Sequence, residues 1–130
     1  MHVRVSLVNV VETAEALHRL GAAVVDPVED ALERGGQWVM YEARDRLRGQ
    51  ITGRYLPHYP RSITSETERA AGRVSMIVGP DSGMLQGGMG PGVEFGSVNA
   101  PPHPHLFEAF EARVESILDR AGRNIARWPQ

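Results

Sequence analysis

The chain has 130 residues, of which 42% are hydrophobic, a formal net charge of −2 and no cysteine. This length and composition predict a single globular domain over residues 1–130. The lack of cysteine excludes disulfides, thiolate metal sites and a cysteine nucleophile. The near-neutral charge gives no electrostatic case for nucleic acid or a membrane surface, and no apolar run approaches the ~20 residues of a membrane span.

The first residues lack the layout of a signal peptide, because Arg4, Ser6 and Asn9 interrupt their apolar run. The default expectation is therefore a soluble protein made inside the cell. All 14 basic residues are arginine. Either a GC-rich genome or selection for planar, bidentate contacts explains this bias, and composition alone does not separate the two.

The first third of the chain predicts a strand and two helices. Val3, Val5 and Leu7 alternate with polar residues, which indicates a half-buried strand. A short helix is expected from Glu12 or Thr13 to Leu20, with Gly21 as its stop. A long helix then begins with Asp26 as N-cap and Pro27 in its first turn. Its apolar stripe consists of Val28, Leu32, Val39, Ala43 and Leu47, and an extension to Ile51 is left open.

Two adjacent glycines, Gly35 and Gly36, lie in the middle of this long helix. Two mid-helix glycines cost about 2 kcal/mol relative to alanine. We therefore expect either a bend at this point or another backbone that packs very close, rather than a true break in the helix.

The next segment predicts an antiparallel hairpin. Pro57 and Pro60 argue against a helix before it. The expected strands are 61–67 and 73–78, joined around 70–72, and Gly79-Pro80 closes the second strand.

A glycine-rich segment follows at 79–92, with six glycines in fourteen residues. Such a segment holds regular structure poorly, so we expect a flexible loop. It carries three apolar side chains, Met84, Leu85 and Met89. They either fold back on the domain's own core or form a partner-binding loop that orders on assembly.

The last part predicts a third strand of the hairpin sheet at Val93 and Phe95, a proline-rich elbow and a closing amphipathic helix over 106–128. The apolar face expected for that helix comprises Phe107, Phe110, Val114, Ile117, Leu118, Ala121 and Ile125. The predicted class is α+β: a long N-terminal helix, a small antiparallel sheet of about three to four strands, the elbow and the C-terminal helix.

No motif makes a positive case for an enzyme or a cofactor. His103 and His105 are only two imidazoles, and nothing in the sequence places His58 or Glu94 beside them as further metal ligands. We instead expect the two histidines to cap the start of the helix. No serine lies in a G-x-S-x-G elbow, and GGMGPG lacks the phosphate-binding G-x-x-x-x-G-K-[ST] pattern. Trp38 and Trp128 are expected to pack or to lie in an interface.

The order of these pieces resembles the head–tail joining family of tailed bacteriophages, from about Val28 onward. That family includes neck and tail-completion proteins related to the minor tail protein Z of phage lambda. The similarity is carried by Glu94-Phe95-Gly96-Ser97, which is like the family's E-F-G-T, and by the proline-rich segment Pro102-His103-Pro104-His105-Leu106-Phe107 before a helix that contains Phe110. Arg61-Ser62-Ile63 matches only part of the family's L-x-x-S-I strand entry. The threonine-glycine before that entry is missing, and His105 stands where an aromatic residue is common.

The resemblance implies a structural virion protein of the head–tail junction, made in the host cytoplasm, with no catalytic residue and no cofactor. It implies a homo-oligomeric ring of the hexamer or dodecamer class that contacts other neck, head-completion and tail-tube proteins. DNA would pass through such a ring without sequence-specific binding, and no membrane is involved. The closest alternative is a tail terminator that caps the tail tube. The expected contact residues are Met84, Leu85, Met89, Arg44, Arg46 and Arg48.

Two other classes are weighed against this one. A small DNA-binding domain would use Arg44, Arg46, Arg48 and Arg54. A metal-dependent hydrolase would use His58, His103 and His105.

Overall fold

The computed structural model describes residues 3–7, 22–50, 56–70, 73–98 and 100–127. The elements are strand β1 (Val3–Leu7), helices α2 (Ala22–Gln50) and α3 (Tyr59–Ser62), strands β2 (Ile63–Ala70) and β3 (Arg73–Pro80), the 3₁₀ turn η1 (Gly87–Met89), and helices α4 (Gly90–Phe95) and α5 (Leu106–Arg127). The α+β class, with a long helix, an antiparallel sheet and a C-terminal helix, is confirmed. The predicted short helix at 12–20, Ile51 and Trp128 lie outside the described residues.

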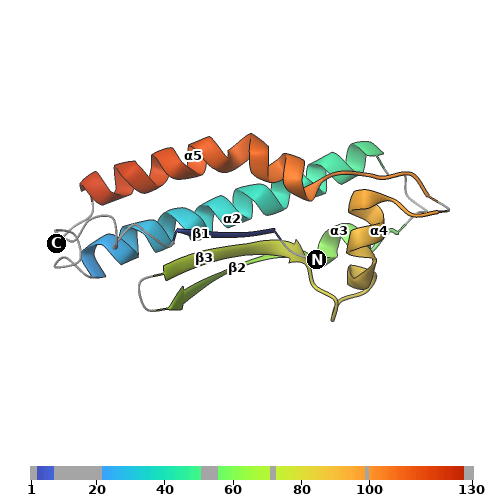
Figure 1. The fold of residues 1–130 in the computed structure, drawn as a ribbon, viewed down its shortest axis with the longest axis horizontal. Coiled ribbons are helices and arrows are strands. Elements are labelled where there is room, and N and C mark those ends of the chain that lie inside the picture. The colour runs from blue at the N-terminus through green and yellow to red at the C-terminus, as the bar shows by residue number, and fades with distance from the viewer. Residues whose placement is uncertain (1–2, 8–21, 51–55, 71–72, 99, 128–130) are drawn as a thin grey trace.

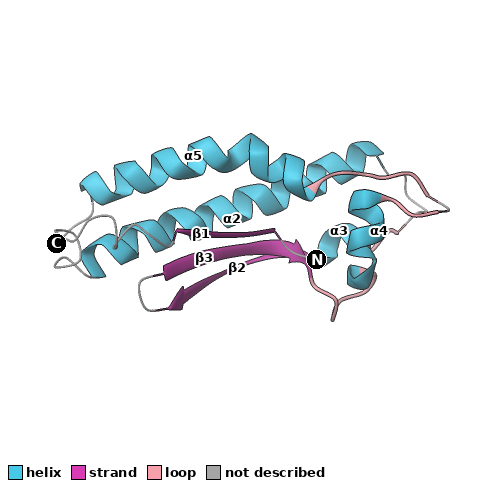
Figure 2. Ribbon diagram, viewed as in Figure 1, coloured by secondary structure: helices cyan, strands magenta, loops and turns pink. Residues whose placement is uncertain are grey.

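The long helices α2 and α5 run antiparallel on one side of the sheet, and α3 and α4 gather at one end of it (Figure 1; Figure 2). No helix of the described part is long and apolar enough to cross a membrane. The strands pair antiparallel in the order β1-β3-β2. The register sets Val3, Val5 and Leu7 opposite Val78, Met76 and Val74. The strands predicted at 3–7 and 73–78 are therefore confirmed, as is the hairpin, in which Ala70 pairs with Arg73.

The expectation that Pro57 and Pro60 exclude a helix is wrong at one turn. Residues Tyr59–Ser62 form α3, and the strand begins at Ile63 instead of Arg61. Pro60 occupies the first turn of this helix, where its missing N–H would have had no helical partner in any case.

Helix α2 begins at Ala22, so Asp26 is not its N-cap and Pro27 lies inside the helix. In a helix the N–H of residue i donates to the carbonyl of residue i−4. Pro27 has no N–H, so α2 lacks only the bond to the carbonyl of residue 23, in its first turn. The Asp26 carboxylate instead accepts a 2.6 Å hydrogen bond from Arg69 on β2. The predicted stripe from Val28 to Leu47 is buried at every position, as expected.

Gly35 and Gly36 allow α2 to pack closely on two sides, which confirms the close-packing prediction. A Cβ added to Gly35 would lie 2.6 Å from Cγ1 of Ile117 on α5, and one added to Gly36 would lie 2.2 Å from the Ser65 hydroxyl on β2. Side chains rather than another backbone make these approaches. The glycine pair is thus the point where α5 and the sheet both come closest to α2.

Helix α5 confirms the predicted C-terminal helix, but its buried face is rotated from the predicted one. Ile117 and Ala121 are buried as expected, whereas Phe107, Leu118 and Ile125 are 44%, 50% and 38% exposed. The contact with Gly35 brings α2 against the Ile117 side of the helix. The adjacent apolar flank therefore remains open to solvent.

The third strand predicted at Val93 and Phe95 is wrong, because these residues belong to α4. Val93 and its neighbour Glu94 are both buried, while Phe95 is 63% exposed. Two consecutive buried residues break the alternation that a half-buried strand requires. The glycine-rich segment before α4 also differs from the expected loop, since it comprises the end of β3, a series of turns, η1 and the start of α4.

Candidate interaction surface

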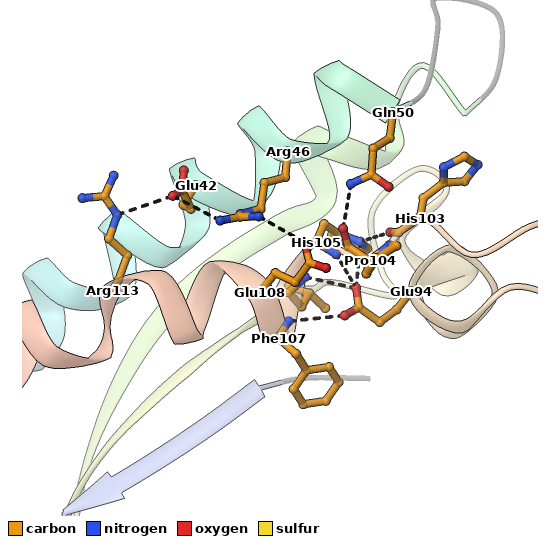
Figure 3. Close-up of polar contacts among 11 residues, drawn as sticks. Glu42, Arg46, Gln50, Glu94, His103, Pro104, His105, Phe107, Glu108 and Arg113 are labelled. Carbon is orange, nitrogen blue, oxygen red and sulfur yellow. Dashed lines mark hydrogen bonds and ion pairs between the residues drawn. The ribbon is translucent and has the colours of Figure 1, made fainter.

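A buried carboxylate caps the N-terminus of α5. Glu94 of α4 accepts hydrogen bonds from the backbone N–H groups of His105 at 2.9 Å, Leu106 at 3.0 Å and Phe107 at 3.3 Å (Figure 3). The first N–H groups of a helix have no partner within the helix, and the helix dipole favours a negative charge there. The capping residue lies eleven residues before His105, on a different helix.

The His105 ring connects this carboxylate to α3. Its Nδ1 atom lies 2.8 Å from Glu94 Oε2 and 2.8 Å from the His103 carbonyl oxygen, and its Nε2 atom lies 2.8 Å from the Tyr59 hydroxyl. Both neighbours of Nδ1 are acceptors, so we assign the ring proton to Nδ1. Tyr59 then donates its hydroxyl proton to Nε2.

The protonation states follow from burial and charge. Burial, and then the negative charge of Glu94, raise the pKa of the Tyr59 hydroxyl well above its usual range. Burial alone would raise the pKa of Glu94, but the hydrogen bonds from the His105 side chain and from the Leu106 and His105 amides outweigh it and lower the pKa to about 2. At neutral pH the cluster therefore contains a neutral tyrosine and an ionised carboxylate.

The Glu94–His105–Tyr59 cluster is closed to substrates. Tyr59 and His105 are fully buried and Glu94 is 4% exposed. The three side chains come from α4, from the residue before α5, and from α3. The arrangement joins these three elements. The expectation that the two histidines cap the helix is wrong, because Glu94 accepts from the first N–H groups, while the His105 ring contacts Glu94, Tyr59 and the His103 carbonyl.

The end of the molecule that this cluster supports presents several exposed apolar side chains. Residues 82–104 contain a single aspartate, glutamate, lysine or arginine, the buried Glu94. We define the tip surface as the exposed apolar side chains of this segment: Met84, Leu85, Met89, Phe95 and Val98. Met84, Leu85 and Met89 therefore do not fold back on the domain's own core, and the prediction that they do is wrong.

Two backbone features shape the tip. Gly96 has a φ of +80°, in the region that favours glycine, and a Cβ there would lie 2.8 Å from the Pro102 nitrogen. The His103 N–H donates to the Val93 carbonyl at 2.7 Å, and Gln50 of α2 donates to the Pro104 carbonyl at 2.7 Å. At the start of α5, the Phe107 ring lies 6.0 Å from the Phe95 ring. The residues Glu94, Gly96, Pro102 and Pro104 of the sequence motif thus hold the chain in place around the tip.

The predicted arginines do not join the tip surface. Arg44 is partly buried and donates to the Pro60 and Ile63 carbonyls at 3.1 and 2.8 Å. Arg46 pairs with Glu108 at 3.0 Å between α2 and α5 (Figure 3). Arg48 is exposed and pairs with Asp45 on its own helix. Of the three, Arg48 has the most exposed side chain, at 71%.

The histidines do not assemble a metal site in the described part of the chain, where no three His, Cys, Asp or Glu residues are grouped to hold an ion. Both ring nitrogens of His105 are hydrogen-bonded. His58 lies elsewhere and lines a shallow pocket with Arg61, Met84 and Leu85.

Comparison of the chain with protein-family models, with curated proteins and with solved structures finds no match. The resemblance to the head–tail joining family therefore stays a prediction from the sequence. The class that the fold and the site define is an α+β domain with exposed apolar side chains in the segment before its C-terminal helix.

Proposed function

We propose that this protein is a structural component of a tailed phage or prophage, a ring subunit at the head–tail junction that joins or completes the tail. A tail terminator that caps the tail tube is the alternative position for the same kind of subunit. The proposal rests first on the sequence resemblance at 94–97 and 102–107. It does not require a reaction, a cofactor or a metal.

The observation that carries the proposal is the tip surface and its mount. A monomer that leaves Leu85 71% and Phe95 63% exposed presents a surface suited to another protein. Nucleic acid and lipid headgroups would select a cluster of arginines instead, whereas the segment at 82–104 has none and Arg61 alone lines a pocket with Met84 and Leu85. The cap from Glu94 to the amides of His105, Leu106 and Phe107 fixes α4, which carries Phe95, to the start of α5.

We further propose that the prolines from 101 to 104 act as an elbow between α4 and α5. Each proline fixes its own φ and restricts the residue before it. The bonds from Gln50 and to Val93 anchor both sides of this segment. In this proposal the elbow sets the direction of the tip relative to the helices.

A head–tail joining assay tests this function. We expect the combined substitution of Met84, Leu85 and Met89 by serine to leave the unfolding midpoint within about 2 °C of the unaltered protein, because all three side chains are exposed. The same protein should fail to join purified heads to tails, as counted by negative-stain microscopy. Substitution is cleaner than deletion of 84–89, because Gly87 is buried against the Asp81 backbone.

The matched control is Arg123→Ser together with Arg127→Ser, two exposed positions near the end of α5 and away from the tip segment. If the variant with serine at Met84, Leu85 and Met89 joins heads to tails at the normal level, the tip surface has no role in joining. Heads and tails that join equally well without this protein would contradict the proposed function itself.

A further inference from the structure

An exposed apolar stripe runs along α5 beyond the tip. Phe107, Leu118 and Ile125 are exposed. Leu118 lies 11 residues after Phe107 and Ile125 lies 18 residues after it, which are about three and five whole helical turns. They therefore lie on one line about 27 Å long, with Val114 half-buried between them. We call this line the α5 stripe.

The α5 stripe is acidic on its exposed side. Glu111 and Glu115 are exposed, and neither forms an ion pair with any residue of the described ranges. A partner that covers the stripe must therefore bring apolar surface together with positive charge.

A ridge with that chemistry lies on α2 of the same chain. Tyr41, which is 55% exposed, is the one exposed large hydrophobic side chain of the described residues outside 84–125. Arg34 and Arg48 stand seven residues to either side of it, with 58% and 71% exposure, and pair only with Asp30 and Asp45 of their own helix. Exposed pairs of that kind contribute less than about 1 kcal/mol and exchange readily. We call these three residues the α2 ridge.

The α2 ridge and the α5 stripe lie on different sides of the molecule. Gly35 faces α5 and Gly36 faces the sheet, and at about 100° per residue Tyr41 is turned more than 110° away from both. Helix α2 packs over β2 and β3, whereas α5 reaches β1, and β1 and β2 are opposite edges of the sheet. One copy therefore cannot cover its own stripe with its own ridge.

We propose that the α5 stripe of one copy binds the α2 ridge of a second copy, in a head-to-tail contact. Tyr41 is the aromatic anchor that packs on Leu118. Glu111 lies seven residues before Leu118, the same separation as each ridge arginine from Tyr41, so an arginine meets Glu111 when the two helices align. A contact between two different surfaces repeats from copy to copy and closes into a ring when the rotation permits. The inference rests on the proposed ring and names the contact that builds it.

Two single variants and their mixture test this contact. Tyr41→Asp removes the ridge and keeps the stripe, whereas Leu118→Asp removes the stripe and keeps the ridge. Each variant alone should be a monomer of 14.3 kDa by sedimentation or light scattering. Their mixture should form a 1:1 dimer and nothing larger, because one good ridge and one good stripe remain. Val98→Asp, the same change at an exposed tip residue, should leave the oligomer intact.

Thermal melts check that the variants are folded, and Tyr41→Ser with Leu118→Ser provides a second pair if aspartate unfolds either one. Charge reversal adds an independent readout: Glu111→Arg should weaken assembly at least ~10-fold, and Arg34→Glu with Arg48→Glu in the same chain should restore it. An oligomer that survives both aspartate variants overturns the contact and leaves the ring standing. A wild-type protein that is monomeric at all concentrations overturns the contact together with the ring.

Discussion

Replacing Glu94 with glutamine is expected to lower the free energy of unfolding by about 3 kcal/mol at pH 7. The glutamine amide keeps the shape but turns a donor toward the N–H groups that the carboxylate accepts from His105, Leu106 and Phe107. The size follows from the pKa of the carboxyl, which is about 2 in the folded protein against an ordinary 4.5. Each pKa unit corresponds to about 1.4 kcal/mol of differential stabilisation.

The same change should alter the dependence of stability on pH. Because the folded pKa of Glu94 lies below the unfolded one, its contribution is fully present above about pH 4.5 and is lost as the pH falls toward about 2. Urea unfolding between pH 7 and pH 2 should show this loss in the unaltered protein. The glutamine variant should lack that component of the acid sensitivity.

The matched control is Glu66→Gln, an exposed carboxylate on β2, which should change stability by less than about 0.5 kcal/mol. Equal effects of the two substitutions would show that Glu94 is not a buried cap. A loss of stability at Glu94 that does not diminish in acid would contradict its ionised state.

Alanine at Gly87 should destabilise the tip by about 3 kcal/mol, whereas alanine at the adjacent Gly88 should be close to neutral. A Cβ at Gly87 would lie 1.8 Å from the Asp81 carbonyl oxygen and 2.6 Å from its carbonyl carbon. These are backbone atoms next to the 2.7 Å bond from the Asp81 N–H to the Ser62 carbonyl, so they cannot rotate aside. Overpacking of this kind costs at least 1–3 kcal/mol. A Cβ at Gly88 meets no atom within 4 Å.

Hydrogen exchange locates the effect. Faster exchange in the Gly87→Ala variant should be confined to residues 81–95, while α2 and α5 keep their protection, because the two long helices pack mainly on each other and on the sheet. Indistinguishable exchange in the Gly87 and Gly88 variants would show that the turn is loosely packed. Uniform loss of protection would place the turn in the main core instead.

The long elements were predictable because each repeats its signal. The apolar residues of α2 recur over five turns and those of β1 and β3 alternate, so periodicity outweighs local noise. The double glycine was also informative. Two glycines destabilise a helix, so their presence in a strongly periodic one indicates close packing, here by the side chains of Ile117 and Ser65. Helix boundaries were less predictable: α2 begins five residues before Pro27, so the proline does not mark its first turn.

The tip was not predictable from local pattern. Six residues from Gly90 to Phe95 are too few to show a helical period, and Val93-Glu94-Phe95 fits a strand equally well. The cap on α5 depends on a carboxylate from another helix, which no spacing rule of a capping box covers. The rotated face of α5 has a similar cause: Phe107, Leu118 and Ile125 are periodic with the core residues, and only the tertiary contact at Gly35 decides which flank is covered.

The predicted contact residues divide in the same way. Met84, Leu85 and Met89 are exposed together near one end of the sheet, as a partner-binding segment requires. Arg44 and Arg46 bond instead to the Pro60 and Ile63 carbonyls and to Glu108 within the domain. Charge clustering in the sequence does not distinguish an arginine that binds a partner from one that holds two elements of its own chain together.

The central claim is that the chain is a ring-forming structural protein, and its native mass tests this most directly. We predict that mass photometry of the purified protein will give one oligomer of fixed stoichiometry, an integer multiple of 14.3 kDa, and that negative-stain averages of the same sample will show closed rings. A protein that stays monomeric from nanomolar to submillimolar concentration, or that forms open chains of variable length, would contradict the claim.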